Sequence, residues 1–314
     1  MERFIARRIA FLFLTLFLTS ILIFCVTQFL PGDVARILLP RDASDEAVAA
    51  KRIELGLDRS PLIQYADWIA GFVSGDWGRS FAWDVPVRPR VAESLRNSLM
   101  LAIVALVFAV PLSIALGVIA GLSEGRWPDH VISLLTLSLV GLPEFVTGVL
   151  LIEFLSHRLG WFPAISSIAP DATFASAFPY LVLPALTATF VLMAYIARLT
   201  RAEVIDQIHR SYVRTAVLKG LAWPTVVYRH VLRNALLPTI TVIAISIGWL
   251  IGGLIVIENV FNYPGLGRLL LSAIRNRDFP VIQAITMTIV VGIVVSNFLA
   301  DLLYAVLNPR IRYE

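Results

Sequence analysis

The sequence predicts an all-α integral membrane protein with six transmembrane helices. Hydrophobic residues make up 58% of its 314 residues and charged residues only 15%, and the mean hydropathy of +0.81 is higher than a water-soluble domain reaches. Several apolar runs are long enough to cross a bilayer core about 30 Å thick, which takes roughly 20 helical residues. Because these runs are continuously apolar rather than alternating, they indicate helices and argue against a β-barrel.

The six expected spans leave one long segment after the first span and one polar loop after the fourth. They are Ile9–Leu30, Ser98–Leu122, Val131–Leu155, Pro179–Leu199, Leu237–Ile257 and Val281–Leu307. The chain therefore divides into an N-terminus (1–8), a first transmembrane helix (9–30), a region of short helices (31–97), a five-helix core (98–307) that includes the loop 200–236, and a C-terminus (308–314).

Basic residues near the first span orient the chain. Three arginines lie within residues 1–8, and basic residues at a helix end favour the cytoplasmic side of the membrane. With an even number of spans, both termini are expected in the cytoplasm, the region 31–97 outside, and the basic loop 200–236 inside. Three arginines between 268 and 277 would then lie outside, against this rule.

The external region 31–97 is predicted to form two short amphipathic helices. Ser44 can cap the first, which Gly56 ends, and Ser60-Pro61 can open the second, which Gly75 ends. Two helices of this length bury little apolar surface by themselves. The region therefore either packs as a cap on the membrane bundle or presents a docking surface to an external partner.

A proline and an acid interrupt the third span. Pro143 removes a helical hydrogen bond and kinks the helix, and Glu144 follows it directly. A carboxylate at mid-membrane costs about 2.5–3.5 kcal/mol on insertion scales, so its side chain is expected to face a cavity or the bundle interior. Glu144 thus either lines a pathway or makes a buried hydrogen bond between helices.

Two further features fall on the outer side of the fifth span. Glu258 ends that span, either as a rim residue or as a gate contact. The segment 264–268 holds a proline and two glycines and predicts a tight re-entrant turn, which belongs to an outer gate or partner dock or is a plain structural turn. The candidates for a pathway or gate are Pro143, Glu144, Glu258, Pro264, Gly265, Gly267 and Arg268.

The sequence carries no motif for catalysis, nucleotide binding or metal binding. It has no phosphate-binding G-x-x-x-x-G-K-[ST] loop, no H-E-x-x-H, no C-x-x-C and no G-x-S-x-G. Its four histidines are scattered. We therefore expect neither an enzyme nor a metal site, and any uphill work must draw its energy from another polypeptide or from an ion gradient.

The loop 200–236 is the most informative polar segment. A helix is expected over Glu203–Lys219, then a turn at Gly220, because glycine adopts left-handed geometry at little cost. A second helix is expected from Trp223-Pro224 to about Leu236. A short helix lying across a membrane face can present its apolar side to a partner's groove or can lie on lipid headgroups, and the pattern alone leaves both open.

Four short segments of this loop stand out: Tyr212-Val-Arg-Thr-Ala216, Lys219-Gly220, Arg229-His230 and Leu232-Arg-Asn-Ala-Leu-Leu-Pro238. In these residues the loop resembles the coupling loop of ABC-importer permeases of the oligopeptide/dipeptide/nickel branch. Other segments resemble the same branch, so the resemblance extends over essentially the whole chain. They are Leu30-Pro-Gly-Asp33, Leu55-Gly-Leu-Asp58, Gln64-Tyr65, Gly75-Asp-Trp-Gly-Arg-Ser80, Val85-Pro86-Val87, Glu258-Asn-Val-Phe-Asn-Tyr-Pro-Gly-Leu-Gly-Arg268 and Asn276-Arg-Asp-Phe-Pro280. The large first external region resembles that of the first, B-type permease of the pair.

The resemblance implies a type I importer permease fold whose energy comes from separate subunits. This chain would form half of a heterodimeric pathway in a bacterial cytoplasmic (inner) membrane. Its partners would be a second homologous permease, two cytoplasmic ATP-binding subunits and an external binding protein, with no nucleic acid. ATP and Mg would be bound by the ATPase subunits, and this chain would hold no cofactor. The residues that the resemblance places at the ATPase contact are Tyr212, Arg214, Thr215, Ala216, Lys219 and Gly220.

The cargo that this branch implies is a short peptide, with nickel, glutathione, opines and glycosides as alternatives in the same importer class. A gradient-driven secondary transporter is the rival from another class. It would need broken helices in both halves of an internal repeat, and only the break at Pro143 is evident. Arg214 stands where many other ABC importers carry a glutamate, as is usual in the peptide branch, whereas the apolar pair Val217-Leu218 departs from that branch.

Overall fold

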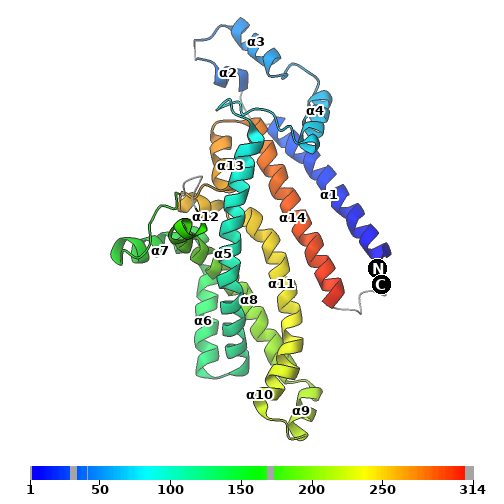
Figure 1. Cartoon of the computed structure of the whole chain (residues 1–314), viewed down its shortest axis with the longest axis vertical. Coiled ribbons are helices and arrows are strands. Elements are labelled where there is room, and N and C mark those ends of the chain that lie inside the picture. The colour runs from blue at the N-terminus through cyan, green and yellow to red at the C-terminus, as the bar shows by residue number, and fades with distance from the viewer. Residues whose placement is uncertain (1, 29–33, 41, 168–172, 308–314) are drawn as a thin grey trace. The chain divides into compact units, whose positions relative to one another are not determined.

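The computed structural model describes residues 2–28, 34–40, 42–167 and 173–307, and within these ranges the regular elements are helices (Figure 1). The expected all-α architecture is confirmed. The helices are α1 (Glu2–Gln28), α2 (Val34–Leu38), α3 (Asp45–Glu54), α4 (Pro61–Ser74), α5 (Val87–Leu122), α6 (Trp127–Gly141), α7 (Glu144–Leu151), the π-helix η1 (Ile152–Arg158), α8 (Phe174–Ile208), α9 (Ser211–Leu218), α10 (Trp223–Val226), the π-helix η2 (Val227–Val231), α11 (Leu232–Gly253), α12 (Ile255–Val260), α13 (Leu266–Arg275) and α14 (Phe279–Leu307). The expectations at 29–33, with the motif Leu30–Asp33, and at 308–314 lie outside the described residues.

Five helical stretches of the described chain are long and apolar enough to cross a membrane. They are Ile5–Gln28, Val87–Leu122, Phe174–Ile208, Trp223–Gly253 and Phe279–Leu303. The expected third span, 131–155, is not one straight helix, because α6 and the α7–η1 segment meet at a bend of 107° and form a span only as a bent pair. Pro143 explains the bend, since it lacks an N–H and disfavours helical geometry at Leu142, whose ψ is 125°.

The described chain forms two compact units. Unit 1 consists mainly of Ser98–Pro264 together with the part of α14 from Val295 onward, and unit 2 consists of Glu2–Asn97 and Gly265–Val294. The candidate loop, the break at Pro143 and Glu258 belong to unit 1, whereas the expected external helices belong to unit 2. Each unit is therefore considered by itself.

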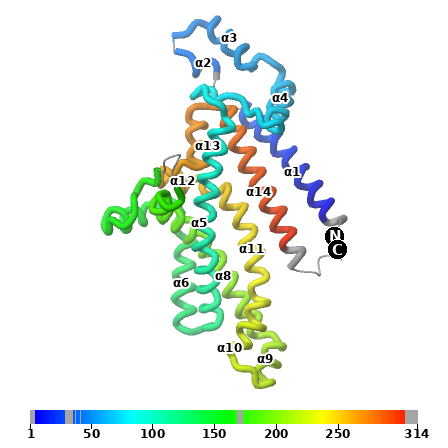
Figure 2. Tube along the Cα trace, in the orientation of Figure 1, coloured from blue at the N-terminus to red at the C-terminus, as the bar shows by residue number. Residues whose placement is uncertain are grey.

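Helix α8 is the centre of the packing in unit 1. It packs against α6, α7, α11 and α12. Figure 2 shows α8 and α11 lying side by side. Fully buried side chains from three helices form the core. They are Leu101 of α5, Leu181, Leu183 and Ile196 of α8, and Leu250 of α11. In a bilayer, such contacts hold helices together by van der Waals packing rather than by a hydrophobic driving force.

Two glycines allow α5 and α8 to approach closely. A Cβ on Gly117 would lie 2.5 Å from the Cβ of Thr200, and a Cβ on Gly121 would lie 2.7 Å from the Cβ of Val204. Small residues at such crossings are typical of helix contacts in membranes. This crossing joins α5 to the part of α8 that leads directly into the candidate loop.

The two amphipathic helices expected in the region 31–97 are confirmed as α3 and α4. The Ser44 hydroxyl accepts a hydrogen bond from the N–H of Ala47 at 3.2 Å, and Gly56 and Gly75 have left-handed φ values of 68° and 85°. The aromatic side of α4 packs on α1, where the rings of Phe24 and Tyr65 are 5.5 Å apart between centroids.

A buried carboxylate ties the loop after α4 to the start of α14 within unit 2. Asp278 is 0% exposed and accepts hydrogen bonds from the Ser80 hydroxyl and from the N–H groups of Phe81 (3.1 Å) and Ala82 (3.2 Å). Since a buried charge without such partners would be strongly unfavourable, these donors hold the loop in one position.

Candidate functional site

The candidate loop follows a different path from the expected one. Helix α8 ends at Ile208, Arg210 is extended with ψ 144°, and a separate helix α9 begins at Ser211. The expectation of one helix over 203–219 is therefore wrong. The separate second helix expected to end near Leu236 is also wrong, because the helical stretch that begins at Trp223 continues to Gly253. The left-handed turn at Gly220 is confirmed, with φ 81°.

Packing explains why the chain turns before α9. Val213 and Ala216 are only 3% and 6% exposed and lie in an apolar cluster with Val204 of α8, Val231 of η2 and Ala235 of α11. A straight extension of α8 would carry this face away from the cluster. The separate helix therefore buries one face of α9 against the helices on both sides of it in the sequence.

Tyr212 adds polar contacts to this packing. Its hydroxyl donates to Oε1 of Gln207 at 2.6 Å and accepts from Nδ2 of Asn234 at 3.2 Å. Gln207 belongs to α8 and Asn234 to α11. The start of α9 is thus fastened to both long helices.

The six expected ATPase-contact residues divide between the two faces of α9 and its end. Arg214, Thr215, Lys219 and Gly220 are exposed, Tyr212 is half-buried, and Ala216 belongs to the buried face. A hollow of about 510 Å³ brings four of them together with three residues that sequence reasoning did not select. Its lining is Ser211, Tyr212, Thr215, Ala216, Lys219, Leu221 and His230. Arg214 and Gly220 are not part of this lining.

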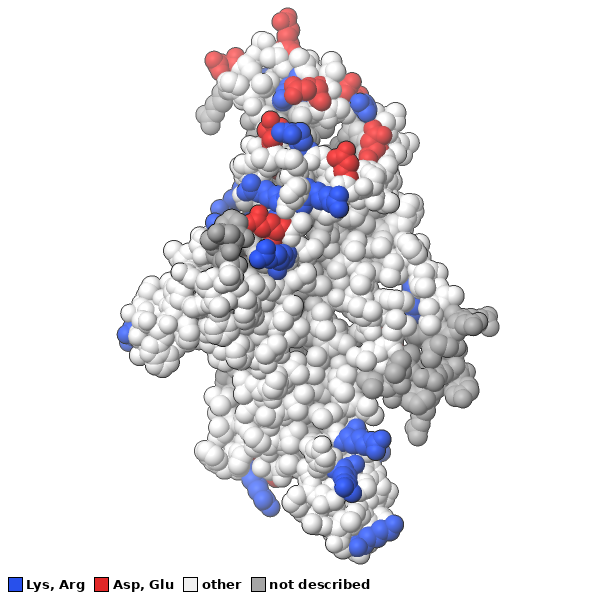
Figure 3. All heavy atoms as spheres, in the orientation of Figure 1, with Lys and Arg blue, Asp and Glu red and all other residues white. Residues whose placement is uncertain are grey.

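Basic side chains gather around α9 and α10 on the face seen in Figure 3. Arg214, Lys219, Arg229 and Arg233 are all exposed. Arg210 is instead paired, with its Nη2 2.8 Å from an oxygen of Asp206, and this hydrogen bond raises the pKa of the guanidinium. The surface around α9 is therefore suited to an acidic or hydrogen-bonding partner.

A buried ion pair braces the helix that leads into α9. Asp129, in the first turn of α6, is 2% exposed and is bound by both Nε and Nη2 of Arg201 on α8, the latter at 2.8 Å. The N–H of Gly125 donates to the same carboxylate at 3.0 Å. No local sequence pattern predicts this pair, because its partners are 72 residues apart.

The break between α6 and α7 lines a cavity of about 210 Å³ in unit 1. Glu144 contributes to it from the first turn of α7, Tyr195 from α8 and Trp249 from α11, with apolar side chains including Leu142 and Val191 around them. Pro143 sets the bend but is not among the lining residues. Tyr195 and Trp249 were not selected from the sequence, because nothing in their local patterns relates one helix to another.

Glu258 is not a rim residue. It is 1% exposed, and the Ser98 hydroxyl at the start of unit 1 donates a hydrogen bond to its carboxylate. Its carbonyl accepts from the N–H of Tyr263 at 2.8 Å, so Glu258 also holds the turn that follows α12. The structure does not bring Glu258 into the cavity of Glu144.

The glycines of the segment 264–268 do not make its turn. Asn262 is the residue in left-handed geometry, with φ 55°. Gly265 is the extended cap of α13, with φ −101°, and Gly267 lies inside that helix. The expectation of a tight turn built on these glycines is therefore wrong in detail, and Arg268 is a residue of the first turn of α13.

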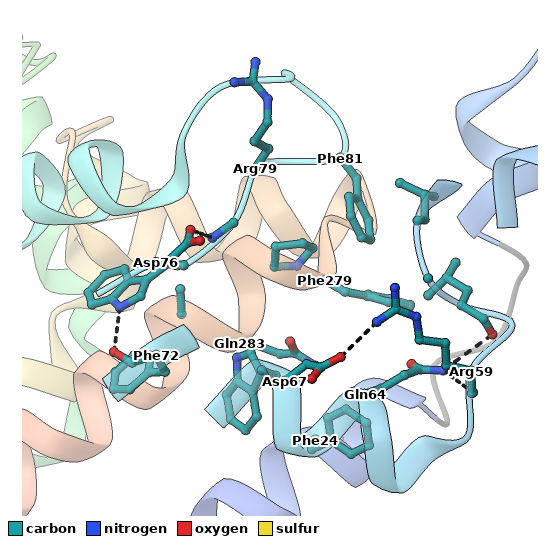
Figure 4. Close-up of a pocket in the computed structure, with 18 of the residues that line it drawn as sticks. Phe24, Arg59, Gln64, Asp67, Phe72, Asp76, Arg79, Phe81, Phe279 and Gln283 are labelled. Carbon is teal, nitrogen blue, oxygen red and sulfur yellow. Dashed lines mark hydrogen bonds and ion pairs between the residues drawn. The ribbon is translucent and has the colours of Figure 1, made fainter. Parts of the chain in front are cut away.

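Unit 2 contains a second cavity, of about 380 Å³, which Figure 4 shows. Residues of α1, α4, the following loop and the start of α14 line it. An ion pair between Arg59 and Asp67 (3.0 Å) occupies one wall, and the stacked rings of Phe72 and Trp77, 5.0 Å apart, form part of another. Its charged side chains have partners inside or beside the lining, as in the pairs Arg59–Asp67, Glu54–Lys51 and Arg79–Asp84, so the cavity has the character of a surface recess between packed elements.

The comparisons with known proteins agree over the whole chain. Residues 113–313 match the family described as "Binding-protein-dependent transport system inner membrane component". Residues 1–116 match its N-terminal counterpart, "Binding-prot-dependent transport system membrane comp, N-term".

Curated relatives are similar along their full length. The "Glutathione transport system permease protein GsiC" of Escherichia coli (strain K12) is 38% identical over 314 residues, which cover 100% of both chains. The protein of the same name from Shigella dysenteriae serotype 1 (strain Sd197) has the same identity and coverage.

A solved structure shares the fold. The "Crystal structure of an amino acid ABC transporter with histidines" superposes with a TM-score of 0.53 at 17% identity, over 69% of this chain and 93% of that chain. At this identity the likeness concerns the fold alone.

Proposed function

Because the chain belongs to the family of inner-membrane components of binding-protein-dependent transport systems, it is a permease subunit of an ABC importer, and we propose that it forms half of a heterodimeric pathway for short peptides. It is not an enzyme, since ATP hydrolysis in such importers resides on separate subunits. The proposal extends to the other subunits: a second homologous permease, two cytoplasmic ATPases and an external binding protein.

The arrangement of α9 supports the proposal that this helix couples ATP hydrolysis to transport. Its exposed residues Arg214, Thr215, Lys219 and Gly220 face away from the buried side that holds Val213. We assign the hollow beside them to the contact with one ATPase subunit. A push on α9 would reach α8 and α11 through its apolar cluster, so a preference of ATP for one ATPase state can shift the permease between two conformations.

The assignment of α9 to the ATPase contact implies an orientation of the chain in the membrane. The α9 loop, 200–236, and both termini would lie in the cytoplasm, because the loop is basic and basic residues favour that side. The region 31–97 would lie outside, where α3, α4 and the recess of unit 2 offer a surface for the binding protein. The core 98–307 would then contain the pathway.

The relatives supply the first cargo to test. Their names assign glutathione to those transport systems, and glutathione is a short peptide derivative within the expected class. We propose glutathione as the first candidate and di- and tripeptides as the wider class.

Purification with its genomic neighbours tests the function. The tagged chain, extracted in mild detergent, should recover a second permease and two ATPase subunits. Hydrolysis should rise when the cognate binding protein is added with glutathione. Recovery of a lone homo-oligomer without ATPase subunits would contradict the coupling assignment, and stimulation by another peptide but not by glutathione would correct the cargo.

A further inference from the structure

The cavity at the break of α6 contains a carboxylate without a protein partner. Glu144 is half-buried, and within the described residues no hydrogen bond or ion pair to its side chain is present. It lies in the first turn of α7, yet no N–H of that turn donates to it. The other acids of unit 1 named above, Asp129 and Glu258, are both hydrogen-bonded.

An unpartnered acid in this position points to a ligand. The two halves of the bent pair, α6 and α7–η1, are apolar enough to form a membrane span. Acidic residues within such segments are costly and are normally paired or placed at a substrate or ion pathway. Since Glu144 lines a cavity of about 210 Å³, a group that enters this cavity can supply the missing partner.

Aromatic side chains define what the cavity can take. Tyr195 is 60% exposed and Trp249 is 42% exposed, although both belong to long transmembrane helices, and both line the cavity with Glu144. The indole of Trp249 lies over Gly253, where an added Cβ would approach its ring to 2.8 Å. The glycine therefore leaves room for this placement of the ring.

A carboxylate with aromatic neighbours favours an organic cation. Aromatic faces attract ammonium groups, and a carboxylate forms strong charge-assisted hydrogen bonds with them. A metal ion is not favoured, because the described chain holds no group of three or more His, Cys, Asp or Glu side chains that could bind one. The volume is smaller than the roughly 300–1,000 Å³ of sites that enclose a whole small molecule, so it suits one end of a longer cargo.

We propose that Glu144, with Tyr195 and Trp249, binds the terminal ammonium group of the peptide cargo during its passage through the permease. This inference rests on the proposed import of peptides and adds to it a site within this chain. It makes Glu144 a specificity residue for cargo that carries a free amino group.

Uptake by the complete importer in proteoliposomes tests the site. The probes are glutathione and glutaryl-cysteinylglycine, which lacks only the α-ammonium group, each supplied at a concentration that saturates the binding protein. Glu144→Gln should lower glutathione uptake about ten-fold or more, the usual scale for losing a hydrogen bond to a charged group, and should leave uptake of the desamino probe within about two-fold. Glu153→Gln, which removes a half-buried acid of η1 paired with Arg158, is the matched control and should change neither.

Two outcomes would overturn the site. An equal loss of uptake for both probes would make Glu144 structural. Dissociation of the sister permease in the Glu144→Gln complex, measured by size-exclusion chromatography, would show instead that the carboxylate pairs across the subunit interface.

A second measurement tests the cation site independently of whether the cargo is a peptide. In the complete importer with Cys25→Ser and Val191→Cys, n-butylammonium should slow alkylation of the introduced thiol by a small maleimide, whereas n-butanol should not. Glu144→Gln should abolish this protection. If the importer takes up neither peptide probe but butylammonium still protects the introduced thiol from alkylation, the peptide cargo is wrong and the cation site stands. If butylammonium gives the thiol no protection, the proposed site is wrong.

Discussion

Asp129 and Arg201 form a two-point ion pair that joins the first turn of α6 to α8 seven residues before α8 ends at Ile208. The pair lies in the same stretch of α8 as Thr200 and Val204, against which Gly117 and Gly121 of α5 pack. The apolar cluster of α9 includes Val204 as well. One short stretch of α8 therefore contacts α5, α6 and α9.

Asp129→Asn is expected to destabilise the permease and to weaken coupling. The change leaves the Arg201 guanidinium without its counter-charge. Because that side chain is 33% exposed, we expect a loss of about 1–3 kcal/mol rather than the larger loss of a fully buried pair. Thermal denaturation in detergent measures the stability, and cargo moved per ATP measures the coupling.

Two further variants provide comparisons for Asp129→Asn. Glu124→Gln removes the negative charge from the exposed contact with His209 (3.0 Å) and should change stability by less than about 1 kcal/mol. Asp129→Leu combined with Arg201→Leu should be more stable than Asp129→Asn, because no uncompensated charge remains. Equal stability of Asp129→Asn and wild type would show that the pair does not brace the helix.

Gly117→Ala should push α5 away from α8. The new Cβ would meet the backbone carbonyl oxygen of Ala197 at 2.6 Å as well as the Thr200 side chain, and a backbone atom cannot move aside easily. Overpacking of this kind costs about 1–3 kcal/mol, measurable as a lower denaturation temperature. Gly141→Ala is the control, since no atom lies within 4 Å of its added Cβ, and it should be tolerated.

Gly220→Val should reduce transport without removing the ATPase subunits from the complex. The residue has φ 81° and open space around it, so the effect comes from backbone strain of about 1–3 kcal/mol and not from a collision. We expect ATP hydrolysis that no longer responds fully to loaded binding protein. Gly220→Asn should retain most transport, because asparagine tolerates left-handed geometry. Normal transport by the valine variant would contradict the role of this turn.

Asp278→Asn should release the loop that follows α4. The neutral amide cannot accept from three donors as strongly as the carboxylate does, and Ser80, Phe81 and Ala82 would lose their common acceptor. Limited proteolysis should cut residues 76–86 at least several-fold faster than in wild type. Asp84→Asn, which alters only an exposed pair with Arg79 at 2.8 Å, should leave the cleavage rate close to that of wild type.

Local features were predictable from the sequence because their causes are local. The approximate places of the five long apolar helices follow from apolar run length, which the bilayer thickness imposes. The break at Pro143 follows from a missing N–H. The left-handed residues Gly75 and Gly220 follow from the absence of a side chain.

Features that depend on a partner helix were not predictable. The glycines at 265 and 267 looked like turn residues, but Asn262 makes the turn. Glu258 was expected as a rim residue or a gate contact, and its burial against Ser98, 160 residues earlier, excludes the rim. In both cases the local pattern permits more than one conformation, and contacts from distant residues select among them.

The sequence by itself determined that this protein is a helical membrane permease, because apolar run length and short motifs are properties of contiguous residues. Only the tertiary structure decided that α9 is a separate helix with Val213 and Ala216 buried, and that Tyr195 and Trp249 share a cavity with Glu144. The physical reason is the same for both. Burial and the convergence of side chains from α7, α8 and α11 depend on how helices pack, and the periodicity of one helix does not specify its neighbours.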